Sequence, residues 1–224
     1  KYPMLFVSIA KFFDRLALLR GKKGKETELT RFFSNKDLNL EMKVRLALGE
    51  FTDEDLRVGG GIIERAICLV TGASPQRVRK LMVEYGEHGE VALLLTQLKK
   101  PRLTTQEVYE AIRILSKLER IEDRILHIAS LLRFATPEEA KYIVRLILGH
   151  LKLGYYERTV IFAVSHAYKV PFEIVERVSA ILGVVDGLKL ASQGGDALSA
   201  VKIRPGQFIK PQLAHIYEPD RVVY

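Results

Sequence analysis

Cysteine is almost absent from this sequence, which has a single one, Cys68. A lone cysteine excludes an intramolecular disulfide and favours a reducing, intracellular compartment. The segment around Cys68 is apolar with helical spacing, so we interpret this residue as a small core side chain.

Long apolar runs are missing as well. No stretch approaches the roughly 18–20 apolar residues that cross a bilayer, so we expect no membrane partner. Lys11, Asp14 and Arg15 interrupt the apolar N-terminal segment, which excludes a signal-peptide layout. The chain begins at Lys1 rather than Met, and we interpret it as a piece of a longer protein.

Motifs for metal binding and catalysis are also lacking. The five histidines show neither HExxH spacing nor neighbouring cysteine pairs. A Walker-type phosphate loop and a G-x-S-x-G turn are both absent. Acidic residues are frequent at the expected helix starts, where the helix dipole accounts for them without catalysis. The sequence therefore predicts no metal ligand and no catalytic residue.

Positive charge is in excess. Lys and Arg number 35 against 27 Asp and Glu, a formal net charge of +8, and the isoelectric point is about 9.5. This excess favours an anionic partner, either nucleic acid or an anionic membrane surface, without choosing between them. A hydrophobic content of 48% indicates a globular chain, long enough for one large core or two small ones.

Nearly every segment has the spacing of an amphipathic helix. Helix starts are marked by Ser74 before Pro75, by Thr104, and by Thr136 before Pro137. The expected helices span about 3–20, 26–34, 39–49, 60–71, 75–85, 87–99, 105–117, 120–134, 137–152, 156–168 and 171–182. Because no alternating strand pattern occurs before about residue 200, we predict an all-α fold.

Two features divide the chain. The basic stretch 99–102 predicts a linker between two helical halves, about 1–100 and 101–200. From 201 to 224, three prolines and β-branched residues occur without a helical period. We interpret 1–200 as a helical domain and 201–224 as an extended tail leading into another domain. No fixed-period repeat is evident, which argues against a regular solenoid.

The segment 138–154 is the most informative. On a helix, its apolar residues share one arc: Ala140, Ile143, Val144, Ile147 and Leu151. Lys141, Arg145 and Lys152 fall within about 40° of one another on a different arc. Gly149 lies beside this basic stripe and Gly154 is placed to end the helix. Such a stripe lets a phosphate backbone approach closely, but an ordinary solvated helix face has the same pattern.

Two further glycine turns adjoin helices. Gly59, Gly60 and Gly61 lead directly into a helix, so that backbone N–H groups and the positive helix end face an anion. Gly86 and Gly89 flank a turn between two helices. Three such turns in a basic helical chain suggest contacts to a sugar-phosphate backbone, which carry little sequence information. Each turn taken alone is also explained by plain helix capping.

The string EAKYIVRLILGHLKLG strongly resembles the signature of the N-terminal DNA-binding domain of ATP-dependent DNA ligases, of the archaeal and eukaryotic replicative type. RVGGGIIERAICLVTGASPQRVRKLMVEYGEHGEVALLL resembles the glycine turn, helix and G-D-x-G turn of that family. LTTQEVYEAI resembles its L-T-x-x-x-V-Y stretch, and KIRPGQFIKPQLA resembles its I-x-P-M-L-A exit. The resemblance covers nearly the whole chain, although the first fifty residues match only in pattern.

The resemblance implies a helical domain that grips nicked duplex DNA through the minor groove. The parent enzyme would seal the nick in replication, repair and recombination, using ATP and Mg²⁺. In this family a lysine of a K-x-D-G motif takes AMP from ATP and passes it to the 5′-phosphate. Here the only Asp-Gly pair, Asp186–Gly187, is preceded by two valines instead. We therefore expect these residues alone not to catalyse ligation.

Several positions depart from the family pattern. His88 is unusual in the G-D-x-G turn, and Gln212 stands where the family commonly has Met. Some archaeal relatives carry a clamp-binding Q-x-x-F-F loop, whereas 97–101 has no aromatic pair, so a sliding clamp is a weakly supported partner. Residues 26–33 have a spacing similar to that of the clamp-binding motif but lack its glutamine. We interpret them as a helix that buries Leu29, Phe32 and Phe33.

The DNA-contacting residues predicted from these patterns are Gly59, Gly60, Gly61, Gly86, Gly89, Lys141, Arg145, Lys152 and Gly154. We expect Lys99, Lys100 and Arg102 to add general electrostatic attraction. The expected partners are nicked double-stranded DNA and the other domains of the ligase. A competing hypothesis is a helical protein-interaction module whose basic face meets an acidic partner. A self-contained nucleotidyltransferase is disfavoured because the lysine motif is missing.

Overall fold

A computed structural model describes residues 2–201 of the chain. Within this range the polypeptide forms α-helices and one short 3₁₀ helix but no strand, and a single antiparallel bridge joins Leu5 to Thr104. The predicted all-α class is confirmed. The predicted tail lies outside the described residues except for Val201, and so does Gln212.

Each helix expected from the sequence has a counterpart among the first eleven. The bounds are α1 Phe6–Leu18, α2 Lys22–Ser34, α3 Leu40–Leu48, α4 Gly60–Thr71, α5 Pro75–Tyr85, α6 His88–Leu95, α7 Thr105–Ile114, η1 Leu115–Lys117, α8 Ile121–Leu132, α9 Pro137–Leu148, α10 Glu157–Ala167, α11 Phe172–Leu182, α12 Val184–Ala191 and α13 Gly195–Ser199.

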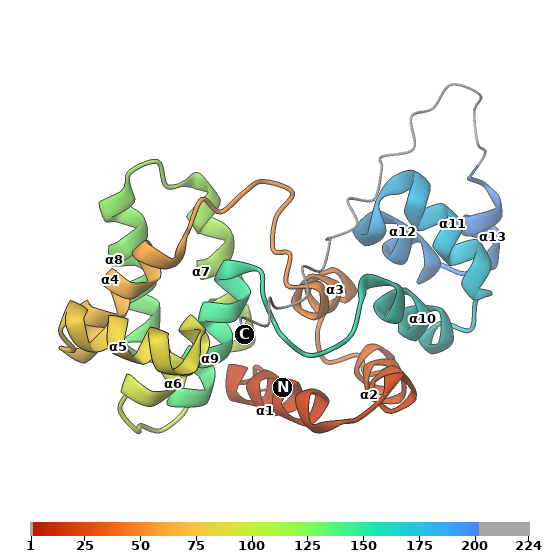
Figure 1. Cartoon of the computed structure of the whole chain (residues 1–224). Helices are drawn as coiled ribbons and strands as arrows, with labels where there is room; N and C mark the ends of the chain where they lie inside the picture. Colours follow the sequence, from red (N-terminus) through yellow and green to blue (C-terminus); the bar gives the residue numbers. More distant parts are fainter. Residues whose placement is uncertain (1, 202–224) are drawn as a thin grey trace, which may run out of the picture.

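The helices gather into two lobes (Figure 1). The first lobe holds α4 to α9, where α4 packs on α8 and α6 packs on α9. The second holds α2, α3 and α10 to α13, where α2 packs on α10. Helix α1 packs against α7 and α9 of the first lobe. The helices are therefore not grouped into the expected halves at residue 100, because α2 and α3 pack with helices from the C-terminal part.

Helix α9 is mostly buried, with nine of its twelve residues in the interior. The predicted apolar arc is confirmed for Ala140, Ile143, Val144 and Ile147, which are buried. Leu151 is buried as well, but it lies beyond the end of the helix. The predicted burial of the apolar side of α2 is also confirmed, at Leu29, Phe32 and Phe33. Cys68 is only half-buried, and it packs at the margin of the core.

Helix α9 ends earlier than the sequence pattern indicated. Gly149 has a left-handed backbone (φ +74°), and its amide donates to the carbonyls of Arg145 and Leu146. This cap closes the helix at Leu148, so Lys152 lies in the loop beyond it. The predicted stripe of Lys141, Arg145 and Lys152 on one helix is therefore wrong.

Helices α12 and α13 were not predicted. Gly183 and Gly187 weaken the helical pattern there, but Gly187 lets α12 cross closely over α11. A Cβ on Gly187 would lie 2.6 Å from the Cα of Ser179. Gly187 thus weakens the helical pattern of α12 in the sequence but permits its close packing on α11.

Candidate nucleic-acid interface

The three glycine turns predicted from the sequence meet on the first lobe. A Cβ on Gly60 would lie 2.6 Å from the ring of His88, so the first two turns are in contact. Next to His88, Glu87 accepts a hydrogen bond from Nη2 of Arg145 at 2.6 Å. Arg145 in turn donates to the carbonyl of Leu151, in the third turn, at 3.4 Å. A chain of contacts therefore joins turns that are far apart in the sequence.

The start of α4 is open to an anion. Gly59 is its N-cap residue and offers no side chain to cap the helix, and the first turn has no acidic residue. Among residues 2–201, no hydrogen-bond acceptor is found for the amides of Gly60 and Gly61. A Cβ built on Gly59 or Gly61 would meet nothing within 4 Å. Exposed helix N–H groups and the helix dipole are both favourable to a phosphate.

The start of α6, in contrast, is already capped by a carboxylate of the protein. Glu87 accepts hydrogen bonds from the amides of Gly89 (2.9 Å) and Glu90 (3.1 Å). Gly89 is buried, and its Cβ would lie 2.9 Å from the side chain of Arg145. Gly89 therefore serves packing, whereas Gly86 is exposed as the left-handed cap of α5 (φ +75°).

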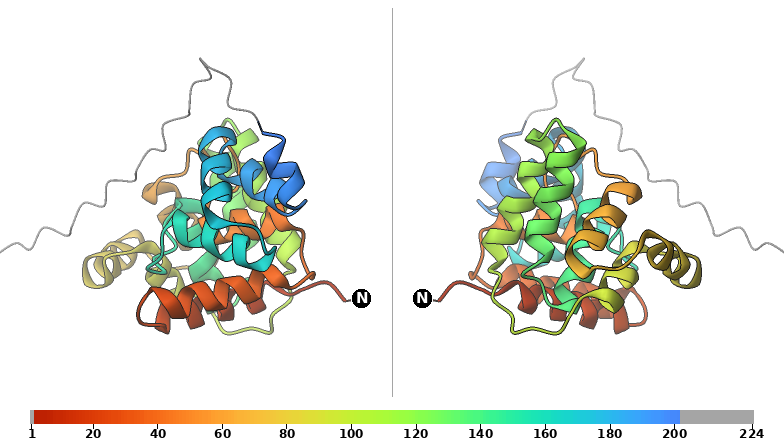
Figure 2. Two further views of the ribbon diagram at one scale, coloured as in Figure 1. Left: turned by 90° about the vertical axis from the view of Figure 1, so that its right-hand side faces the viewer. Right: turned by 90° about the vertical axis from the view of Figure 1, so that its left-hand side faces the viewer.

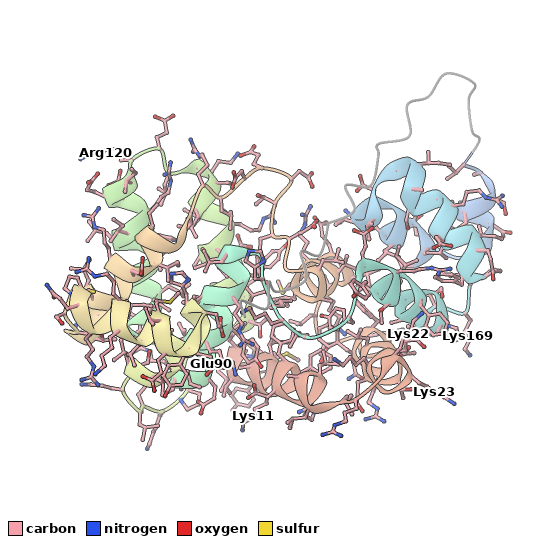
Figure 3. All side chains as sticks on the ribbon, in the orientation of Figure 1. Lys11, Lys22, Lys23, Glu90, Arg120 and Lys169 are labelled. Carbon is pink, nitrogen blue, oxygen red and sulfur yellow. The ribbon has the colours of Figure 1, made fainter. Side chains whose placement is uncertain are left out.

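Arg145 and Lys141 face the interior of the first lobe. The side chain of Arg145 is 9% exposed and pairs with Glu87 and Glu90 of α6. Lys141 pairs at 3.2 Å with Glu90, which is labelled in Figure 3, and its ammonium lies 3.9 Å from the carboxylate of Asp14 on α1. Both cations are thus bound by carboxylates of the protein, which corrects the expectation that they form an outward-facing stripe.

The pKa of Glu87 reflects this arrangement. Burial by itself raises the pKa of the carboxyl, but the hydrogen bonds and positive charge of Arg145, with the Gly89 amide, outweigh it, and the pKa of Glu87 is lowered. Glu87 is therefore an ionised internal anion that holds α9 and the start of α6 together.

The loop 149–156 carries the exposed residues of the predicted third turn and crosses from the first lobe to the second (Figure 1). Lys152 and Gly154 are both exposed with left-handed backbones, at φ +55° and +70°. Tyr155 anchors the loop by donating to the carbonyl of Ala47 at 2.6 Å. Lys152 is thus presented on a loop whose ends are fixed to both lobes.

Two buried cations that the sequence patterns missed hold these turns in place. The ammonium of Lys25, on α2, donates to the carbonyl of Leu153 and lies against Gly154. Arg124, on α8, donates to the carbonyl of Arg57, two residues before Gly59, and to those of Leu118 and Glu119. The contacts from Lys25 to Leu153 and from Arg124 to Arg57 join distant segments, so no local sequence pattern contains them.

The basic stretch 99–102 lies near the other end of α9. Lys99 donates to the carbonyl of Arg133 at 2.9 Å, and burial lowers the pKa of its ammonium. Arg102 stacks over the ring of Phe134, 4.2 Å from its centroid. Lys100 is exposed. Since α9 is about 18 Å long at 1.5 Å per residue, these cations are not gathered with the glycine turns at its C-terminal end.

The described part of the chain lacks both membrane-crossing helices and clusters of metal-binding side chains. No helix of residues 2–201 is long and apolar enough to cross a membrane. Within the same range, no group of three or more His, Cys, Asp or Glu side chains is arranged to hold a metal ion.

The fold and the surface define a class of protein: a two-lobed, all-helical domain with glycine turns and an exposed lysine loop gathered beside α9. The chain belongs to the family described as DNA ligase N terminus, whose sequence profile matches residues 5–165.

Curated relatives extend the similarity over most of the chain. A DNA ligase of Nanoarchaeum equitans is 31% identical over 228 aligned residues, which cover 94% of this chain and 40% of that protein. DNA ligase 1 of Methanosarcina acetivorans is 29% identical, with coverage of 95% and 39%. A DNA ligase of Thermococcus fumicolans is 31% identical, with coverage of 94% and 41%. The chain thus spans about two fifths of the length of these relatives.

Proposed function

We propose that this chain is the DNA-binding domain of an ATP-dependent DNA ligase and holds nicked duplex DNA through the minor groove and the sugar-phosphate backbone. The observation that carries the proposal is the gathering of the glycine turns beside α9, in a member of the DNA ligase N-terminal family. Uncapped helix amides and an exposed lysine suit phosphate contacts that do not depend on sequence.

The burial and contacts of the predicted residues support different roles for them. We assign direct backbone contacts to Gly59, Gly60, Gly61, Gly86, Lys152 and Gly154, which are all exposed except the half-buried Gly60. Gly89, Lys141 and Arg145 form the internal scaffold under these turns, whereas Lys99, Lys100 and Arg102 supply attraction at longer range. The parent enzyme uses ATP and Mg²⁺, and the lysine that takes AMP from ATP belongs to a K-x-D-G motif that this sequence lacks. The other ligase domains are the expected partners, acting on intracellular DNA, and a sliding clamp is not part of the proposal.

Equilibrium binding tests this function. The chain is titrated with a nicked duplex, an intact duplex and a single strand of the same sequence across a salt series. We expect duplex to bind more tightly than single strand, with a log–log slope of about −0.9 for each phosphate neutralised. Failure to bind duplex at low salt, or a flat salt response, would overturn the proposal.

A matched pair of variants localises the surface. Lys152→Glu should abolish duplex binding and lower the salt slope, because an exposed cation becomes an anion at the turns. Lys169→Glu is the control, since Lys169 is also exposed with a left-handed backbone (φ +56°) but follows α10 in the second lobe (Figure 3). Equal losses of duplex affinity in both variants would show that binding depends only on the net charge of the chain.

The alternative, a protein-interaction module with a basic face for an acidic partner, predicts a different result in the same assay. Such a module would bind heparin and duplex equally well at equal charge density, because only the sign of the charge is recognised. A clear preference for duplex therefore separates the two functions.

A further inference from the structure

A groove separates α5 from α4 and α8, next to the glycine turn at the start of α4. It encloses a cavity of about 470 Å³, within the size range of ligand pockets in proteins. The residues that line this α4–α5 groove are Gly61, Glu64, Arg65, Cys68, Leu69, Pro75, Val78, Arg79 and Ile125. Most of its lining side chains are apolar, and charged groups lie among them.

Helix α5, one wall of the groove, projects from the first lobe (Figure 2). Val78 is its only buried residue. Leu69, on the opposite wall, is 61% exposed. An 11-residue helix held by so little burial is marginal in water, and apolar side chains left open beside a cavity favour a partner that covers them.

The charges at the groove indicate the chemistry of that partner. Arg65 and Arg79 are exposed, and neither side chain has an ion pair or hydrogen bond among the residues the structure describes. The single acidic residue of the lining, Glu64, lies 4.0 Å from His88. An apolar floor with two uncompensated guanidinium groups is complementary to an apolar anchor flanked by carboxylates.

We propose that the α4–α5 groove binds a short, acidic, amphipathic segment of a separate protein. The apolar anchors of the segment lie against the exposed Leu69 and Pro75, and its carboxylates pair with Arg65 and Arg79. The groove shares Gly61 with the proposed DNA surface, but none of the side chains that bind the segment is among the residues assigned to DNA contacts.

Other occupants fit less well. A second copy of this chain carries a net charge of +8 and is repelled. Residues 202–224 of the same chain contain four Lys and Arg against two Asp and Glu, which is the wrong sign for the rim. A duplex presents phosphates, which gain nothing from an apolar floor.

The single cysteine of the chain provides the readout, because Cys68 lines the groove. The rate of Cys68 alkylation by N-ethylmaleimide is measured with a helical peptide of about 16 residues that has leucines on one face and glutamates elsewhere. A second peptide has lysines in place of the glutamates. At ten times its Kd, the glutamate peptide should slow alkylation about tenfold, since only the free fraction reacts, and the lysine peptide should not.

Two double variants, each of which replaces two basic residues with glutamate, test whether the position of the charge matters. Arg65→Glu with Arg79→Glu should weaken binding of the glutamate peptide about tenfold. Arg77→Glu with Lys80→Glu changes the net charge equally, but these two exposed residues of α5 do not line the groove, so affinity should hold.

Three results would overturn the proposal. The first is equal protection of Cys68 by both peptides, and the second is no protection by either. The third is protection by duplex DNA, or a greater loss of duplex affinity in the groove reversal than in its control, since the groove would then belong to the DNA surface. The two peptide results do not depend on whether the wild-type chain binds nicked DNA.

Discussion

Single glycines have different tasks in this domain, and their surroundings distinguish them. Gly60 and Gly89 are sites where a Cβ would collide with His88 or Arg145. Gly154 needs its left-handed backbone, and Gly61 faces open space at the start of a helix. Of these four glycines, only Gly61 can take a methyl group without strain in the folded chain.

Gly61→Ala separates stability from DNA binding. Stability should hold or rise by up to about 1 kcal/mol, because alanine is the better helix residue. Duplex affinity should fall, because the new methyl group blocks close approach of the phosphate backbone. Urea unfolding and duplex titration of the same preparation measure both effects, and an unchanged affinity would remove Gly61 from the contact surface.

Gly154→Ala should lower the free energy of unfolding by about 1–2 kcal/mol, since a left-handed backbone is unfavourable for alanine. Its Cβ would also lie 2.5 Å from the ammonium of Lys25. Gly72→Ala is the control, because Gly72 has a similar φ of +74° with nothing within 4 Å of its Cβ. Urea unfolding measures the loss of unfolding free energy in each variant. A larger loss in Gly154→Ala than in Gly72→Ala reports the cost of displacing Lys25. Equal losses would mean that Lys25 moves away without cost.

At the scale of elements, charged pairs fasten helices to one another. Arg145 of α9 holds Glu87 at the start of α6, and Lys25 of α2 holds the loop that carries Lys152. These contacts set the relative positions of the turns.

The Glu87–Arg145 pair makes stability depend on pH. Because the folded pKa of Glu87 lies below the ordinary value, its stabilisation is full above about pH 5 and is lost as pH falls through the folded pKa. Glu87→Gln should cost about 3 kcal/mol at pH 7, by leaving Arg145 without its carboxylate, and the cost should shrink towards pH 3. Urea unfolding across this range tests it, with Glu84→Gln on the exposed side of α5 as control. A cost that does not change with pH would contradict this account.

Lys25 is expected to position the loop rather than to touch DNA. Lys25→Met should reduce duplex affinity about tenfold without changing the salt slope, since no phosphate contact is removed. Lys23→Met, at an exposed position of the same helix, should change neither quantity (Figure 3). A lower slope in Lys25→Met would instead make Lys25 a phosphate ligand.

At the scale of the whole molecule, the chain has the scaffold of a binding domain. Incubation with labelled ATP and Mg²⁺ should leave no covalent AMP on it, because the K-x-D-G lysine motif is missing. Gel electrophoresis under denaturing conditions measures the label, and a labelled band would show that another lysine can be adenylated.

Much of the local structure could be predicted from the sequence. The capping box of Thr136 and Glu139 begins α9 where expected, and both of its reciprocal hydrogen bonds are present. The helical spacing of α2 correctly indicated which side chains are buried. Helix ends were harder to predict from the sequence. Gly149 and Gly154 both follow apolar residues and both have a left-handed backbone, but only Gly149 ends α9.

The first eleven helices, their apolar faces and the glycine turns could be predicted from the sequence, because capping and helical spacing act between residues at most four positions apart. Sequence motifs also indicated the family. Which basic residues face outward depends on the tertiary fold. Arg145 meets Glu87 across 58 positions and Lys25 meets Leu153 across 128. The burial of a cation depends on which distant carboxylate or carbonyl the packing places beside it, and no local pattern contains that information.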